Sequence, residues 1–184
     1  MRGFRMMLAA ACMVAGFGAA AAANDGKSID CSDTGMTFDA PGYKITCRDY
    51  SDPMASWSGQ SFALKRMTLY ALLESDGTFL RAIDDHILGS TRIYYHKGSV
   101  ETDVGRYFKG DFTQWSDSEE VGDFDVKHFS AKFEGDKEAV DCVAFRRQGG
   151  RRFSGIGGLT VGIACSLLGR EKADAAMKQF SEGN

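Results

Sequence analysis

The sequence has 184 residues, of which 43% are hydrophobic and 26% are charged. This composition indicates a folded globular protein and excludes collagen-like and intrinsically disordered classes. The chain carries 22 basic and 25 acidic residues, and this acidic balance disfavours a nucleic-acid-binding domain, which would be expected to be basic.

Residues 1–23 have the pattern of a signal peptide. Arg2 and Arg5 precede an apolar stretch over residues 6–17, and Ala21-Ala22-Ala23 satisfies the small-x-small rule for cleavage. We expect cleavage before Asn24, which leaves one domain over residues 24–184 in the periplasm or outside the cell. Because both leader charges are arginines, this domain has 20 basic and 25 acidic residues.

Two alternatives to cleavage before Asn24 fit the leader less well. An uncleaved anchor is long enough, since residues 6–23 number 18, but it is rich in alanine and would insert weakly. A lipid anchor on Cys12 would need a large aliphatic residue three positions earlier, where Ala9 stands. No later segment has 18 apolar residues, so we expect no membrane span in the mature chain.

The first elements in chain order are strands, followed by a helix. Residues 43–47 alternate as a strand does. The apolar residues of 62–73 fit both the spacing of a helix and the alternation of a strand, and we interpret this segment as a strand. Phe79, Ile83 and Ile87 have helical spacing, so residues 79–87 are predicted to be a helix. Residues 92–96 are then predicted to be a strand.

The second half contains a predicted hairpin, a further strand and a helix. Residues 124–133 and 138–147 flank Gly135-Asp136, a two-residue turn signal. The register that follows places Phe129 opposite Cys142 and Asp125 opposite Arg146. Residues 159–165 form the next strand, and residues 170–180 form a second helix. The sum is an α+β fold, a mostly antiparallel sheet with two packed helices in a single disulfide-stapled domain.

Four cysteines remain after the leader: Cys31, Cys47, Cys142 and Cys165. An even number in an exported chain predicts disulfides, with three possible pairings. The turn-forming residues 39–42 lie midway between the first two cysteines. The glycine-rich residues 148–158 surround the midpoint of the last two. We therefore predict Cys31–Cys47 and Cys142–Cys165. Zinc ligands usually occur as closer pairs, so neither a metal nor another cofactor is expected.

Sequence motifs for catalysis are absent: the chain contains no H-E-x-x-H, G-x-S-x-G or G-x-x-x-x-G-K. His86, His96 and His128 are interpreted as structural, and Asp84 and His86 would point apart on the predicted helix. Gly155-Ile156-Gly157 precedes a strand rather than a helix, so it is interpreted as a flexible loop. An acidic run is expected to be a solvated loop and not a calcium site; it comprises Asp117, Glu119, Glu120, Asp123 and Asp125.

The local charge anomaly is a run of four arginines, Arg146, Arg147, Arg151 and Arg152, around two glycines. Guanidinium groups bind phosphate and carboxylate groups, which predicts an anion- or partner-binding loop. The alternative is a solvated turn whose arginines pair with the protein's own acids. Because Asp125 is expected opposite Arg146, the other three are the better candidates.

The leading hypothesis for function is a non-enzymatic exported domain that contacts an envelope protein or an anionic envelope component. Two other classes stay open. One is an enzyme, such as a hydrolase, whose polar groups converge from separated elements. The other is a small-ligand-binding module with a pocket between sheet and helices.

Overall fold

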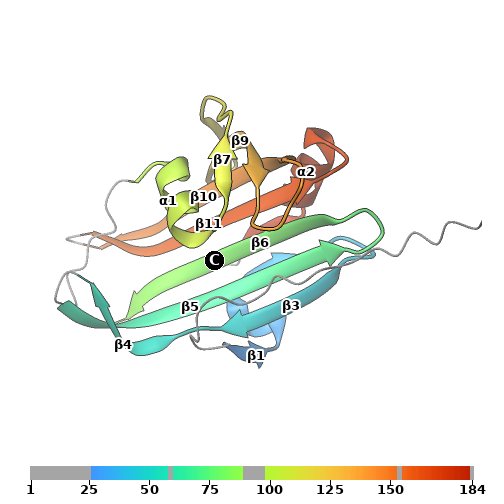
Figure 1. The fold of residues 1–184 in the computed structure, drawn as a ribbon. Coiled ribbons are helices and arrows are strands. Elements are labelled where there is room, and N and C mark those ends of the chain that lie inside the picture. Colours follow the sequence, from blue (N-terminus) through green and yellow to red (C-terminus); the bar gives the residue numbers. More distant parts are fainter. Residues whose placement is uncertain (1–25, 58–59, 89–97, 153–154, 183–184) are drawn as a thin grey trace, which may run out of the picture.

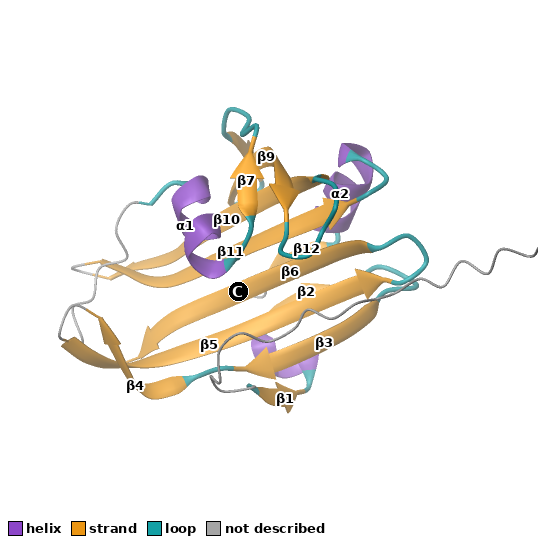
Figure 2. Ribbon diagram, in the orientation of Figure 1, coloured by secondary structure: helices purple, strands orange, loops and turns teal. Residues whose placement is uncertain are grey.

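A computed structural model describes residues 26–57, 60–88, 98–152 and 155–182. The described chain forms a ten-stranded antiparallel sheet with a smaller two-stranded sheet and two α-helices packed against it (Figures 1 and 2). The mostly antiparallel α+β architecture predicted from the sequence is therefore confirmed. Within the described ranges, neither helix is long and apolar enough to cross a membrane.

The order of strands in the large sheet is β1-β3-β5-β6-β11-β10-β9-β7, with β4 paired to β5 and β8 paired to β9. The small sheet pairs β12 with β2. The strands are β1 Lys27–Ile29, β2 Met36–Phe38, β3 Lys44–Asp49, β4 Asp52–Trp57, β5 Gln60–Leu73, β6 Thr78–Leu88, β7 Asp111–Thr113, β8 Glu119–Val121, β9 Phe124–Lys132, β10 Val140–Arg152, β11 Gly155–Ser166 and β12 Phe180–Glu182. The helices are η1 Cys31–Thr34 (3-10), α1 Val100–Tyr107 and α2 Arg170–Met177.

The helix predicted over residues 79–87 is wrong, because this segment is strand β6, paired with β5 and β11. A spacing of four residues also fits a strand, where every second side chain lies on the same face. Phe79, Ile83 and Ile87 therefore share one face of β6 and Leu80 and Ala82 lie on the other. Both faces are covered, so the strand lacks the polar alternation that would have identified it.

The hairpin of β9 and β10 has the predicted register, with Phe129 opposite Cys142 and Asp125 opposite Arg146. Strand β10 continues into β11, where Cys142 lies opposite Cys165. Residues 148–152 and 155–158 of the expected loop are strand instead, because β10 runs to Arg152 and β11 starts at Gly155. The interpretation of residues 155–157 as a flexible loop is therefore wrong.

Both predicted disulfides are present. Cys31 and Cys47 are joined with their Cα atoms 5.2 Å apart, and Cys142 and Cys165 with theirs 4.1 Å apart. The second bridge joins directly opposed residues of β10 and β11, as the midpoint argument requires. Cys31 is not in a hairpin strand: it begins the helix η1, and Ile29 is the residue opposite Cys47.

The large sheet is covered on both faces. One face carries α2, β2 and β12, and its core includes Met36, Leu80, Phe145 and Phe180. The opposite face carries α1. Its core consists of buried side chains from the sheet and from α1; they are Ile83, Val100, Val104, Phe108, Phe129, Ala131, Phe133, Cys142, Ala144, Val161, Ile163 and Cys165. Charged side chains that enter either layer must therefore be paired.

The second predicted helix is α2, which ends at Met177, three residues earlier than expected. Its predicted apolar stripe is confirmed by the burial of Ala173, Ala176, Met177 and Phe180, although Phe180 belongs to β12. Helix α1 was not predicted. The leader and the strand expected over residues 92–96, including His96, lie outside the described residues.

An acid-sensitive ion pair holds α1 to β9. The Lys127 ammonium lies 2.6 Å from Oε1 of Glu101. Burial alone raises the pKa of Glu101, but hydrogen bonds from Lys127 and Ser99 outweigh it and lower this pKa from 4.5 to about 2. A carboxyl group with a depressed folded-state pKa stabilises the fold above its unfolded pKa. This stabilisation is therefore lost as the pH falls from 4.5 towards 2.

Glu101→Gln is expected to remove about 1.5–3 kcal/mol of unfolding free energy at pH 7, the size of a hydrogen bond to a charged group. The difference between this variant and the parent should shrink as the pH falls from 4.5 towards 2. Urea denaturation at several pH values measures it, and a difference that does not change with pH would contradict the assignment.

Candidate functional site

A row of polar side chains crosses three neighbouring strands on the α2 face of the sheet. Asp84 of β6 lies opposite Thr160 of β11, and Thr160 lies opposite Arg147 of β10. Cross-strand neighbours present their side chains to the same face. Asp84 is only 4% exposed and Thr160 only 2%, so a charged group sits within the layer between the sheet and its cover.

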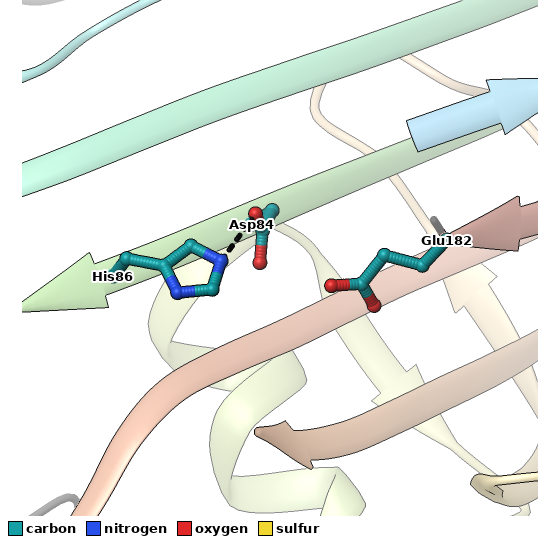
Figure 3. Close-up of side chains that lie close together, drawn as sticks. All are labelled: Asp84, His86 and Glu182. Carbon is teal, nitrogen blue, oxygen red and sulfur yellow. Dashed lines mark hydrogen bonds and ion pairs between the residues drawn. The ribbon is translucent and has the colours of Figure 1, made fainter. Parts of the chain in front are cut away.

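Glu182 reaches this row from β12, almost one hundred positions along the chain from Asp84 (Figure 3). One of its carboxylate oxygens, Oε2, accepts a hydrogen bond from Thr160 Oγ1 at 2.7 Å and lies 2.7 Å from the guanidinium of Arg147. Thr160 Oγ1 also lies 3.1 Å from Oδ1 of Asp84. Because a hydroxyl group has one proton, it donates fully to only one of these carboxylates at a time.

His86 completes the cluster from the same strand as Asp84. Residues two apart on a strand share a face, and the Nε2 atom of His86 lies 2.8 Å from Oδ2 of Asp84. Gly158 is opposite His86 on β11, and a Cβ atom there would lie 2.8 Å from Nδ1 of the ring. The absence of a side chain at position 158 therefore leaves the space that the imidazole occupies.

The charges around His86 favour its protonated form. Its pKa is raised from 6.5 by the hydrogen bond to Asp84 and by the negative charges of Asp84 and Glu182, against the opposing effects of burial and Lys65. Arg147 pairs with Glu182, whereas His86 is the partner in the ion pair of Asp84.

Asp84, His86 and Glu182 each offer one ligand atom, and these atoms all lie within 4.8 Å of one another. A nitrogen and two carboxylate oxygens in such proximity are ligands that transition metals accept. The side chain of His86 is 44% exposed, so the cluster can be reached from solvent. Among the residues that the structure describes, these three have ligand atoms close enough together to hold one metal ion.

The four arginines that the sequence predicted to share one binding loop lie in three different places. Arg146 is 5% exposed and lies on the α1 face, where its Nε donates to Asp103 at 2.5 Å. Arg147 is on the α2 face, paired with Glu182 and 3.9 Å from Asp123. The backbones of Arg151 and Arg152 pair with β11 at the far end of the hairpin, and their side chains lie outside what the structure describes.

The acidic run after Trp115 is partly built into the sheet. Glu119 and Glu120 lie in β8, and the carboxylates of Glu119, Asp123 and Asp125 lie within ion-pair distance of His128, Arg147 and Arg146 respectively. The two residues in β8 are thus in a strand and not in the loop that the sequence suggested.

The other described histidine, His128, lies between two acids on opposite sides of its ring. Its Nε2 atom is 2.7 Å from Asp174, and its Nδ1 atom is 3.7 Å from Glu119. Neither His128 nor His86 has a side-chain hydrogen bond to a serine, threonine or cysteine within the described ranges. Neither histidine therefore has the hydrogen bond to a hydroxyl or thiol nucleophile through which a histidine activates it.

The cluster of Asp84, His86 and Glu182 was not predicted from the sequence, because residues 79–87 were expected to form a helix. On a helix Asp84 and His86 diverge, and on a strand they face the same way. The D-x-H spacing was a usable signal once the segment was recognised as a strand. Glu182 gave no local signal, because only the pairing of β12 with β2 brings it to the sheet.

No family model, curated protein or solved structure matches the chain.

Proposed function

We propose that this protein is an exported, disulfide-stabilised binding domain that contacts an envelope protein or an anionic envelope component through the end of the β10–β11 hairpin. The observation that carries the proposal is the length of this hairpin. The pairing of β10 with β9 ends at Arg146, and the pairing of β11 with β6 begins at Gly158. The hairpin itself continues to the pair of Arg152 and Gly155.

Beyond Arg146 and Gly158, the two strands have only each other as partners among the described strands. The outer edges of such a two-stranded ribbon keep backbone groups that a partner can pair with, because no neighbouring strand of the sheet uses them. Arg151 and Arg152 are carried at this end, next to glycines that allow an anion to approach the backbone. Arg146 and Arg147 already pair with acids of the chain, so the proposal assigns the contact to Arg151 and Arg152.

The compartment follows from two supporting observations. The leader over residues 1–23 is typical of export, with cleavage before Asn24. The two disulfides suit an oxidising compartment, since such bonds are rare where thiols are kept reduced. The periplasm or the extracellular space is therefore the proposed destination. A catalytic role has less support, because the described histidines lack a nucleophile within hydrogen-bond distance.

The test is a charge-matched comparison of partner binding. The native protein is recovered from its compartment at low salt, its companion is identified, and the affinity of the purified pair is measured by calorimetry. We expect Arg151→Ser with Arg152→Ser to weaken binding at least about tenfold, because charge-assisted hydrogen bonds to an anion are lost. Added salt should weaken binding by the unmodified protein.

The control removes the same charge from exposed positions elsewhere. Lys109 and Lys178 are both exposed, and replacing both with serine lowers the net charge equally without touching the hairpin. Equal losses in the two double variants would show a general charge effect. Full binding by the arginine double variant would eliminate the hairpin end as the contact.

A further inference from the structure

We propose that Asp84, His86 and Glu182 bind one divalent transition-metal ion, with Zn²⁺ as the reference ion, between β6 and β12. This site is separate from the end of the hairpin and goes beyond the partner-binding role. It rests on the convergence of three ligand atoms from two distant parts of the chain (Figure 3).

The ligand set favours a transition metal over Ca²⁺ or Mg²⁺. One imidazole and two carboxylates match the nitrogen and oxygen donors that Zn²⁺ accepts. Calcium prefers six to eight oxygen ligands, and magnesium rarely takes a histidine. Three protein ligands also leave one tetrahedral position for water or for a group from a partner.

The distances require only a small closing movement. Tetrahedral ligands about 2.1 Å from a zinc ion lie about 3.4 Å from one another, whereas the three atoms here lie within 4.8 Å. The side chain of His86 is half exposed and can turn, and Gly158 leaves its ring free of a Cβ contact on that side. Glu182 keeps a second carboxylate oxygen besides the one that faces Arg147 and Thr160.

The charge of the cluster supplies an independent reason. Asp84 is buried, and among the described residues its charged partner within 4 Å is a histidine rather than a lysine or arginine. Its neighbour Glu182 shares the single hydroxyl proton of Thr160 with it. Buried carboxylates are stable where they are paired or where they coordinate a metal. A divalent ion placed between them would satisfy both.

The test is calorimetric titration of the disulfide-bonded protein with Zn²⁺, with Mg²⁺ as the comparison ion. We expect one zinc ion per chain, no measurable Mg²⁺ binding under the same conditions, and a higher unfolding temperature with zinc, because a ligand that binds only the folded state stabilises it. His86→Gln and Glu182→Gln should each weaken zinc binding at least about tenfold.

His128→Gln is the matched control, because His128 is also flanked by two acids but they lie on opposite sides of its ring. This variant should bind zinc as the parent does. The unfolding temperature without metal shows that each variant is folded, and the exposure of His86 makes His86→Gln the safer of the two. The proposal is overturned if the parent does not bind zinc. It is also overturned if the His86 and Glu182 variants bind zinc as well as the parent, or if His128→Gln loses binding equally.

Discussion

Replacing Asp103 with alanine is expected to lower the free energy of unfolding by about 3–5 kcal/mol, the cost of leaving one partner of a buried ion pair alone. Asp103 is 1% exposed and Arg146 is 5% exposed. Asp103 joins α1 to the sheet by accepting from the Nε atom of Arg146. Asp125 lies 3.5 Å from another nitrogen of Arg146, but it is half exposed and compensates only in part.

The double variant Asp103→Ala with Arg146→Met separates two causes of the lost stability. One is the loss of the attraction between the two side chains, and the other is the buried charge of Arg146 left without its partner. We expect it to recover most of the loss, because an apolar side chain of similar length leaves no buried charge. Urea denaturation of the two single variants and the double variant completes the cycle. A single Asp103→Ala variant that loses less than about 1 kcal/mol would show that the pair behaves as a surface ion pair.

Gly162→Ala is expected to lower the free energy of unfolding by about 3 kcal/mol, at the upper end of the cost of overpacking a core. Gly162 lies opposite Phe145, and a Cβ atom at position 162 would come within 2.1 Å of the phenylalanine ring. The ring cannot move aside easily. It is fully buried, and the rings of Phe124 and Phe180 pack against it with centroids 5.5 Å and 4.9 Å away.

Gly149→Ala is the control for this prediction, because it lies on the same strand pair and its added Cβ would meet nothing closer than 3.7 Å. We expect it to change stability by no more than about 0.5 kcal/mol. Phe145→Leu combined with Gly162→Ala should be less unstable than the sum of the two single variants, since a smaller side chain leaves room for the methyl group. Thermal and urea unfolding measure the stability of the parent and of the four variants. Additive effects on the free energy of unfolding would show that Gly162 is not needed to make room for the Phe145 ring.

The sequence predicts strand pairing well where turn residues define the register. The β9–β10 pairing and the Cys142–Cys165 pair both follow from counting outward from a turn, because in a hairpin each strand residue has one opposite position. The connecting loops were less predictable. Gly135 takes a positive φ of 93° as a turn glycine can, but the described connection from β9 to β10 is longer than two residues.

The sequence fails where a segment is buried on both faces or where a helix is short. In β6, apolar side chains four residues apart fit both a helix and a strand. The segment is a strand because it pairs with β5 and β11. Helix α1 has eight residues, and its signals are the cap Ser99 and the spacing of Val100, Val104 and Phe108. These signals could have identified it, but propensity alone rarely stabilises so short a helix.

In the candidate site, too, local sequence patterns can place some residues, whereas others are brought in only by tertiary pairing. Asp84 and His86 could have been placed together from the sequence, because they are separated by one residue and need only the correct period. Glu182, Thr160 and Arg147 could not, because tertiary pairing brings three separate strands to one place. Local patterns carry no information about which distant strand covers which face of a sheet.

The pairing of β2 with β12 has a consequence for the order in which the chain can fold. Phe38 and Phe180 face each other from near the two ends of the described chain, and both belong to the core that covers Phe145. A polypeptide that crosses a membrane from its amino terminus would have this core open until residue 180 has emerged. Contacts between such distant residues are made late, since closing the loop between them costs entropy. In an exported chain the covering of this core would therefore wait until β12 has crossed the membrane.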